Sequence, residues 1–257
     1  AMAAHLPRRP LLAGALGLAL LAGAMAGLWN GVLVAIVGIQ PIVATLILMT
    51  SGRGIAQLIT EGRILTFDAE PFAWLGSGIL LGLPVPVFIW VLTAVGVAAL
   101  MRRTALGLLV ESIGINRSAS ALAGVNATVL LIAVYMASGL CAALAGIIAT
   151  ADIRGADANN AGLWLELDAI LAVVIGGTSL LGGRFSVAAS VLGAMIIQTI
   201  DTGILLAGFP SEYNLVIKAG LVLMILLIQS PNLVGHWHFL RHSLRRDPDA
   251  SPRGAKS

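Results

Sequence analysis

Long apolar runs separated by polar segments dominate this chain. The runs cover residues 11–38, 42–60, 87–101, 128–151, 186–206 and 215–228. A helix needs about 20 mostly apolar residues to cross the hydrocarbon core of a bilayer. The pattern therefore predicts an all-α, polytopic transmembrane bundle with about six or seven spans, if a shorter apolar segment at residues 169–175 also crosses.

Two features interrupt this pattern. Pro41 ends the first run, and residues 169–175 are too few to span a bilayer before a glycine-rich stretch begins. Irregular backbone at membrane depth is tolerated only where it is buried in protein or lines a cavity. We therefore expect a short or broken helix here, with an ordinary tight turn as the alternative. The glycines of this stretch are Gly176, Gly177, Gly182 and Gly183.

A polar segment at residues 102–126, which we call the island, separates two long apolar runs. It is far longer than the few residues that a turn between two neighbouring helices needs. It opens with Arg102 and Arg103 and carries small residues at helical spacing. This pattern predicts a structured cytoplasmic element on which a partner protein docks. It favours a transport subunit that receives its energy from another protein.

Composition excludes the soluble classes of protein. The chain is 58% hydrophobic and 11% charged, whereas soluble domains carry about 25% charged residues. The net charge of +3 comes mostly from arginines outside the apolar runs and does not indicate a nucleic-acid partner. The single cysteine, Cys141, lies in an apolar run, so no internal disulfide is possible and a small core residue is expected.

The domain organisation is simple. Residues 1–240 are expected to form one transmembrane domain, and the polar residues 241–257 a disordered cytoplasmic tail. Residues 1–10 begin with Ala1 and lack the order of regions found in a signal peptide. We therefore expect the start of the protein to lie upstream of this sequence.

Arginines near the ends of the runs predict the orientation. Cytoplasmic segments are enriched in lysine and arginine. The arginines of the island and of the tail can both lie inside if residues 169–175 cross, and Arg184 then also lies inside. Arg8 and Arg9 fall outside, against the rule, which favours earlier spans that set the topology.

Polar side chains inside the apolar runs are candidates for a translocation path, because such groups are costly in lipid and usually functional. Most are amides, which are neutral and both donate and accept hydrogen bonds, and so suit a neutral polyhydroxyl solute better than an ion. Hydrogen bonding between helices is the alternative. The candidates are Asn30, Gln40, Gln57, Gln198 and Asp201.

The polar stretch at residues 152–168 falls on the outer face in this orientation. It mixes carboxylates, amides and a tryptophan, which suit a sugar or a docking protein. A solvated loop with an aromatic anchor at the membrane interface is the alternative. Its polar and aromatic residues are Asp152, Arg154, Asp157, Asn159, Asn160, Trp164 and Glu166.

We find no catalytic constellation, and the sequence predicts no metal or cofactor. Nucleophile elbows, zinc-protease motifs and phosphate-binding lysine loops are all absent from the sequence. His236, His238 and His242 have spacings that could place a metal, but no cysteine or carboxylate joins them. A histidine cluster at the membrane interface beside Trp237 is the preferred interpretation.

Several motifs stand at fixed places along the chain. They are Gly27-Leu28-Trp29-Asn30-Gly31, Ala44 to Met49, Gly114-Ile115-Asn116 with Ala119, Gly124-Val125-Asn126, Ser138-Gly139 through Ala145-Gly146, the stretch Ala151 to Asp168, and Leu167-Asp168-Ala169-Ile170 leading into Val174 to Gly183. Together they resemble the permease subunits of bacterial sugar ABC importers of the ribose, xylose and arabinose type. The stretch Ala151 to Asp168 resembles galactofuranose importer permeases, as do Gly27 to Gly31 and Ala44 to Met49.

The resemblance implies a division of labour. ATP hydrolysis would belong to a separate ATPase subunit, the solute would arrive on a periplasmic sugar-binding protein, and two permeases would form the path in the inner membrane. Residues 115–125 would be the coupling helix that enters a cleft of the ATPase, with Glu111 at its rim. The island residues implied in this contact are Asn116, Arg117, Ser118, Ala119, Ser120, Ala121 and Gly124.

The resemblance has one departure. The first spans of the family, with a Gly-Gly-Ile-Asp-Leu-Ser-like motif, are absent from this sequence. Because a bundle without those helices would be left open, we expect that this chain does not transport by itself.

Two other classes of function remain open. An ion-coupled secondary transporter would use Asp201 or Glu166 as its coupling carboxylate, but it would need no docking island. A membrane-embedded enzyme is disfavoured because paired catalytic groups are lacking.

Overall fold

The computed structural model describes residues 8–67, 69–178, 182–208, 216–220 and 223–224. The helices are α1 (Arg8–Val32), the π-helix η1 (Leu33–Val37), α2 (Pro41–Thr60), α3 (Glu70–Ser77), α4 (Val85–Arg103), α5 (Leu106–Ile115), α6 (Arg117–Leu122), α7 (Ala127–Asp152), α8 (Leu165–Ile175) and α9 (Val187–Leu206). The strands are β1 (Leu65–Thr66), β2 (Ile79–Leu80), β3 (Leu83–Pro84) and β4 (Gly155–Ala156).

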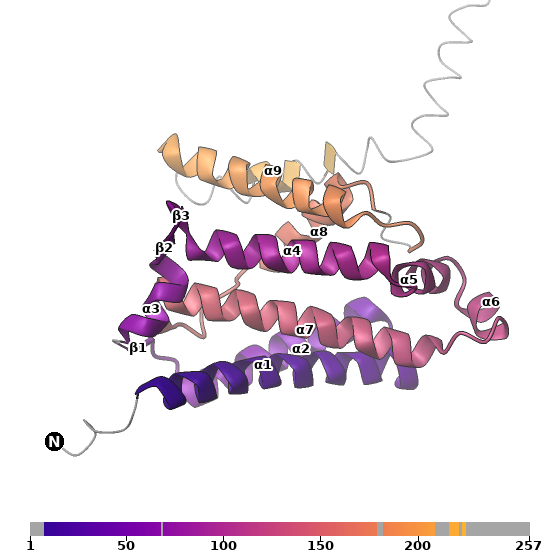
Figure 1. Cartoon of the computed structure of the whole chain (residues 1–257), viewed down its shortest axis with the longest axis horizontal. Helices are drawn as coiled ribbons and strands as arrows, with labels where there is room; N and C mark the ends of the chain where they lie inside the picture. Colours follow the sequence, from indigo (N-terminus) through magenta and orange to yellow (C-terminus); the bar gives the residue numbers. More distant parts are fainter. Residues whose placement is uncertain (1–7, 68, 179–181, 209–215, 221–222, 225–257) are drawn as a thin grey trace, which may run out of the picture.

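The long helices lie side by side across the molecule (Figure 1). Within the described ranges, five helices are long and apolar enough to cross a membrane. They are Leu12–Val37, Pro41–Thr60, Val85–Arg103, Ala127–Asp152 and Val187–Leu206. The prediction of an all-α polytopic membrane bundle is confirmed. Half of the last predicted span, residues 215–228, lies outside the described residues, as do the whole histidine cluster and the tail.

The two ends of the bundle carry different elements. The island helices α5 and α6 lie at one end, and α3 with the short strands lies at the other (Figure 1). Strand β1 pairs antiparallel with β4, so Leu65 is opposite Ala156, and this pair fastens the loop after α2 to the loop after α7. Strands β2 and β3 form a second antiparallel pair just before α4. These two-residue pairs lie outside the spans and leave the all-α bundle intact.

Glycines bring α1 and α7 into close contact. Gly23, Gly27 and Gly31 follow one another at four-residue spacing, so they share one face of α1. A Cβ atom at Gly31 would lie 2.9 Å from the Cα of Ile132, and one at Gly23 would lie 2.5 Å from the carbonyl oxygen of Gly139. Small residues permit this approach of two backbones, which is the main source of helix association in lipid.

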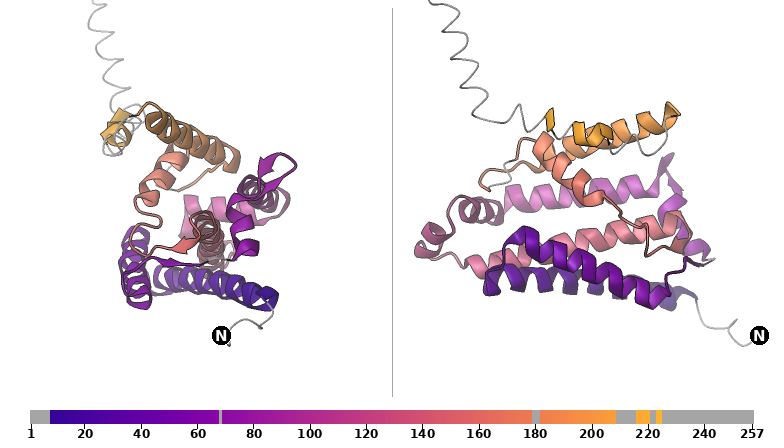
Figure 2. Two further views of the ribbon diagram at one scale, coloured as in Figure 1. Left: turned by 90° about the vertical axis from the view of Figure 1, so that its left-hand side faces the viewer. Right: turned by 180° about the vertical axis from the view of Figure 1, so that it is seen from behind.

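Helices α8 and α9 form a second packed pair on the other side of the bundle (Figure 2). Leu171, Ala172 and Ile197 are buried between them. Gly176 approaches the backbone of Ala189, where an added Cβ would lie 2.8 Å from the carbonyl carbon. At about 1.5 Å per residue, the 11 residues of α8 are too short to cross a bilayer.

The outward faces of the spans are apolar. Leu58 on α2 is 81% exposed and Leu92 on α4 is 75% exposed. In water an apolar surface of this extent would be unfavourable, whereas in a bilayer lipid tails solvate it. The exposed faces therefore support the membrane assignment made from composition.

Candidate functional site

The island folds into two short helices, and asparagine side chains cap the start of the second of them, α6, and the start of the span that follows, α7. The side chain of Asn116 begins α6 and accepts a hydrogen bond from the Ala119 N–H at 3.0 Å. The side chain of Asn126 begins α7 in the same way, accepting from the Val129 N–H at 3.2 Å. Asparagine is among the best residues at this position because its oxygen satisfies a free helical N–H. The island is therefore a defined structure and not a loose loop.

Most of the predicted coupling residues are on the surface of the island. Ser120 is the exception, because it is 7% exposed and its hydroxyl donates to the Asn116 carbonyl oxygen at 2.9 Å. Gly124 has φ of 85°, a left-handed conformation that favours glycine, and it turns the chain from α6 towards α7. The exposed members of the set are Asn116, Arg117, Ser118, Ala119, Ala121 and Gly124.

A cavity of about 410 Å³ lies between the island, α7 and the turn that joins η1 to α2. Its lining is mostly apolar, with Val34, Ile113 and Leu131 among its members. Gln40 and Arg117 also line it. The guanidinium of Arg117 donates to the carbonyl oxygen of Ala35 at 3.0 Å. The cavity therefore brings one predicted path residue and one predicted coupling residue to the same place.

The glycine-rich stretch after α8 lies against α5. A Cβ atom added at Gly114 would lie 2.9 Å from the backbone nitrogen of Gly183. Arg184 forms an ion pair with Glu111 at 3.7 Å, in which the arginine side chain is 94% exposed. Arg184 is thus at the same end of the bundle as the island, as the charge pattern predicts. Gly176 and Gly177 directly follow the last residue of α8, and Gly177, Gly182 and Gly183 all have positive φ.

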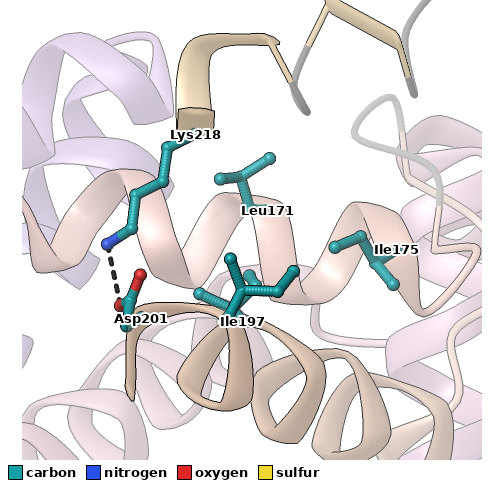
Figure 3. Close-up of a pocket in the computed structure, with 6 residues that line it drawn as sticks. Leu171, Ile175, Ile197, Asp201 and Lys218 are labelled. Carbon is teal, nitrogen blue, oxygen red and sulfur yellow. Dashed lines mark ion pairs between the residues drawn. The ribbon is translucent and has the colours of Figure 1, made fainter. Parts of the chain in front are cut away.

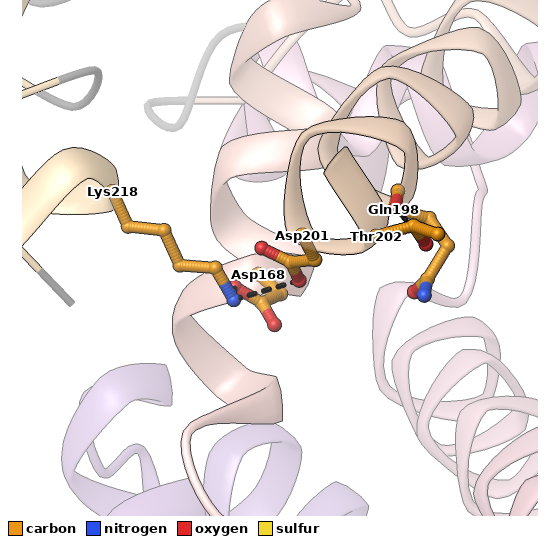
Figure 4. A network of polar contacts seen from close by, with 5 residues as sticks. All are labelled: Asp168, Gln198, Asp201, Thr202 and Lys218. Atoms are coloured by element: carbon orange, nitrogen blue, oxygen red, sulfur yellow. Dashed lines mark hydrogen bonds and ion pairs between the residues drawn. The ribbon is translucent and has the colours of Figure 1, made fainter. Parts of the chain in front are cut away.

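The other predicted path residues are dispersed. Asn30 is buried on α1, and its side-chain oxygen has no hydrogen-bond partner among the described residues. The amide of Gln57 donates to the side-chain oxygen of Asn159 at 2.9 Å, in the loop at the end opposite the island. Gln198 is exposed on α9 and points away from Asp201 in Figure 4. The described residues therefore do not bring the five candidates into one site.

Asp201 belongs to a cluster of charged groups that sequence reasoning missed. The ammonium group of Lys218 lies 2.6 Å from a carboxylate oxygen of Asp168 and 2.9 Å from one of Asp201 (Figure 4). The three side chains are 12%, 21% and 15% exposed, respectively. Apolar residues of α8 and α9, including Leu171 and Ile197, lie beside the Lys218–Asp201 pair (Figure 3).

A signal for this cluster is present in the sequence. Lys218 is a single basic residue inside the last apolar run, and such a residue nearly always has a partner. Asp168 stands out in the sequence only as part of a family motif. Which carboxylates pair with Lys218 depends on how α8 and α9 face each other, and the linear pattern does not report this.

The outer loop at residues 152–168 is ordered by its own polar groups. One carboxylate oxygen of Asp157 accepts from the backbone N–H groups of Asn159 at 2.9 Å and Asn160 at 3.2 Å. The other accepts from the side chain of Asn160 at 2.9 Å. The Asn160 side chain, followed by the two backbone N–H groups, lowers the pKa of Asp157 below its ordinary value. These bonds favour the ionised carboxylate and hold the loop in a turn.

The remaining loop residues occupy distinct places. Asn159 also donates from its side chain to the Gly62 carbonyl oxygen at 3.0 Å, which joins this loop to the end of α2. The backbone carbonyl of Arg154 accepts from the Phe67 N–H at 3.1 Å, and Asp152 is the last residue of α7. Trp164 is 48% exposed just before α8, and Glu166 lies in the first turn of that helix. The loop thus presents an ordered polar surface with an exposed aromatic group.

No group of three histidine, cysteine or acidic side chains that could hold a metal occurs in the described part of the chain. Cys141 is a partly buried free thiol on α7.

Comparison with known proteins gives the family. Residues 1–227 match the family described as the branched-chain amino acid transport system permease component. The galactofuranose transporter permease protein YtfT of Escherichia coli K12 is 62% identical over 212 residues, which are 82% of this chain and 62% of that protein. The fructose import permease protein FruF of Bifidobacterium longum is 41% identical over 233 residues, covering 89% of this chain and 64% of that protein.

A third relative has a lower sequence identity. The ribose import permease protein RbsC of Escherichia coli K12 is 38% identical over 222 residues, covering 84% of this chain and 68% of that protein. No solved structure matches the chain. The chain spans 62% and 64% of the lengths of the first two relatives. The match over residues 1–227 and the identity to these permeases confirm the resemblance seen in the motifs, and this chain belongs to the branched-chain amino acid transport system permease family.

Proposed function

We propose that this chain is the membrane-spanning permease subunit of an ATP-binding-cassette importer in the bacterial inner membrane, and that the importer carries a monosaccharide. The structural observation that carries this proposal is the island. It is a pair of short helices at one end of a bundle whose long helices have apolar outward faces. A secondary transporter, which is driven by an ion gradient, needs no element on which an ATPase docks.

The identity of the sugar is proposed from the relatives. Galactofuranose is the first candidate because the galactofuranose permease is 62% identical, compared with 41% for the fructose permease and 38% for the ribose permease. A pentose-like sugar is the second candidate. A polyhydroxyl solute suits neutral amides, and the unpartnered oxygen of the buried Asn30 is a group of that kind.

The proposal assigns separate roles to the two ends of the bundle. The island would dock on an ATPase subunit, which supplies the energy. The outer loop, with its ordered polar groups around Asp157 and the exposed Trp164, would meet a periplasmic sugar-binding protein. A second permease subunit would complete the path. The residues 1–240 would form the membrane domain, and residues 241–257 a cytoplasmic tail.

The test is reconstitution of the full-length gene product with its ATPase and binding protein in proteoliposomes. We expect ATP-dependent uptake of labelled galactofuranose. Scrambling residues 116–124 should abolish copurification of the ATPase, because the docking surface is lost. Scrambling the exposed residues 160–163 of the outer loop is the matched control and should leave the ATPase bound. If the ATPase copurifies equally well with the scrambled island, the coupling assignment is wrong.

A secondary transporter is the competing proposal, and the charged cluster around Asp201 is the observation that favours it. Carboxylates within the membrane often bind coupling ions. Here, however, Lys218 already pairs with both carboxylates. Uptake that survives ATP depletion and stops when the proton gradient is collapsed would establish the secondary transporter and exclude the importer.

A further inference from the structure

The island contacts two interruptions of the helical bundle, and this shared contact indicates how movement of the island would reach the path. The first interruption comprises η1 and residues 38–40, between α1 and α2. The second is the glycine-rich stretch between α8 and α9, of which residues 176–178 and 182–186 are described. Both lie at the end of the bundle that carries the island.

At the first interruption the carbonyl of Ala35 lacks its usual helical donor. In an α-helix the Ile39 N–H would donate to the Ala35 carbonyl oxygen four residues earlier. Here the Ile39 N–H donates to Leu33 at 3.0 Å, and the Gly38 N–H also donates to Leu33. Gly38 has φ of 81°, so the chain leaves the helix at this point. Ala35 itself is only 7% exposed, and a buried carbonyl needs a partner.

Arg117 supplies that partner from the island. Its guanidinium donates to the Ala35 carbonyl oxygen at 3.0 Å across 82 positions of sequence. A guanidinium stays charged in proteins, and its hydrogen bonds to carbonyls near a helix end are stronger than those of a neutral donor. The same side chain lines the cavity next to Gln40.

The second interruption touches the island through backbone alone. A Cβ atom at Gly182 would lie 2.5 Å from the Gly114 carbonyl oxygen, and one at Gly114 would lie 2.9 Å from the Gly183 nitrogen. With no side chains between them, α5 and this stretch cannot shift independently by much. Close-packed contacts of this kind transmit displacement.

We propose that Arg117 is a positioning residue that transmits movement of the island to the chain interruption beside Gln40, and that the Gly114–Gly183 contact carries the same movement to the stretch between α8 and α9. This inference rests on the proposed importer function. It adds that Arg117 acts through its contact with the chain interruption inside the bundle, and not through a contact with the ATPase. Loss of its side chain would therefore uncouple uptake from ATP hydrolysis without releasing the ATPase.

The experiment uses the full importer with its native cysteines, Cys141 included, replaced by alanine and with Val37→Cys, so that a single thiol reports on the first interruption. Val37 is 61% exposed and follows Ala35 closely in the chain. The rate of labelling with a small thiol reagent is measured without nucleotide and after trapping with ATP and vanadate. The variants are Arg117→Gln, Arg117→Lys and the matched control Arg184→Gln at the same end of the bundle.

We expect Arg117→Gln to reduce uptake by about tenfold, the usual size of a coupling effect, while the ATPase still copurifies. The nucleotide-dependent change in labelling at residue 37 should disappear in this variant. Arg117→Lys, which keeps a charged donor, should retain part of both signals. Arg184→Gln should behave like the parent protein, because its ion pair is long and exposed.

Three results would overturn the inference. Full uptake in Arg117→Gln would show that the bond is not needed, and a preserved labelling change would show that movement reaches residue 37 without it. Loss of ATPase copurification would place Arg117 in the docking surface. The parent protein distinguishes these failures from failure of the importer proposal, because in the latter case the parent protein itself shows neither ATP-dependent uptake nor a copurifying ATPase.

Discussion

Lys218 is a largely buried basic residue whose charge is balanced by two carboxylates. Two carboxylates accept from one ammonium group at 2.6 and 2.9 Å in a region lined by apolar helices. A buried ion pair adds little stability over an apolar replacement of the whole group. Removing one partner, however, leaves an uncompensated charge. The three charged side chains therefore join residues 216–220 to α8 and α9, and the loss of any one of them leaves a charge without its partner.

We predict that Lys218→Met lowers the stability of the purified protein by about 3 kcal/mol, because two carboxylates lose their counter-charge. Thermal unfolding in detergent, followed by size-exclusion chromatography, measures this change. Adding Asp201→Asn to Lys218→Met should recover part of the loss. Equal stability of Lys218→Met and the parent protein would show that the ion pairs contribute nothing.

Asp157 provides the pH-dependent prediction. Its pKa is lowered in the folded loop, mainly by the Asn160 side chain, so the ionised form stabilises the loop. This contribution is complete above the ordinary pKa of 3.8 and is lost as the pH falls through the lowered value of the folded state.

We therefore expect the loop at residues 158–163 to keep its protection from hydrogen exchange down to about pH 4 and to lose it in more acidic solution. Asp157→Ala should show the unprotected loop at neutral pH. Asp157→Asn keeps an accepting oxygen and should lie between the two. Protection that is unchanged in Asp157→Ala would mean that the strand pair β1–β4 alone holds the loop.

At the scale of elements, the contact between α1 and α7 depends on the absence of side chains. A Cβ atom at Gly27 would overlap the Tyr135 carbonyl oxygen, which is backbone and cannot rotate away. By contrast, a Cβ atom at Gly17 on the same helix meets nothing within 4 Å.

We predict that Gly27→Ala destabilises the bundle by about 2 kcal/mol, since overpacking forces the two helices apart. Gly17→Ala is the matched control, because it adds the same methyl group to the same helix in open space. It should be neutral or should stabilise by about 0.5 kcal/mol through helix propensity. Thermal unfolding of both variants in one detergent compares them, and equal midpoints would refute the packing argument.

The ends of the helices could be predicted because they depend on residues close to them in the sequence. Pro41 is the first residue of α2, where its missing N–H costs nothing, and this explains why the apolar pattern breaks there. The bounds of α4, α7 and α9 lie close to the predicted runs for the same local reason. The segment before α4 forms α3 and the β2–β3 pair, because Pro84 and Pro86 disfavour one continuous helix through these residues.

For the whole molecule, the structure puts the island and the outer loop at opposite ends of the bundle (Figure 1). If the charge rule holds, the island is cytoplasmic. We predict that, in a full-length protein whose native cysteines, Cys141 included, are replaced by alanine, Ala161→Cys reacts with a membrane-impermeant maleimide in spheroplasts of cells expressing it. Ser118→Cys should react only after the membrane is permeabilised. The reverse pattern would invert the topology and exclude the island as a cytoplasmic docking element.

The candidate site was only partly predictable. The island is recognisable in the sequence by its length and polarity. A polar segment between two spans lies outside the bilayer, and this one is longer than a turn between helices requires. The hydrogen bond from Arg117 to Ala35 could not be predicted from the sequence. The two residues are 82 positions apart, and the acceptor is a backbone carbonyl, which every residue has. The pairing of Lys218 with Asp168 and Asp201 was not predictable for a similar reason.

The sequence by itself determined which segments enter the membrane, where they are interrupted, and which end carries the positive charge. These properties follow from the bilayer as solvent, which acts on each segment separately. Only the tertiary structure decided which faces of the helices meet. Which faces meet depends on the rotation and register of neighbouring helices. As a result, Gly27 faces α7, Lys218 lies between two carboxylates, and Arg117 reaches the interruption that contains Gln40.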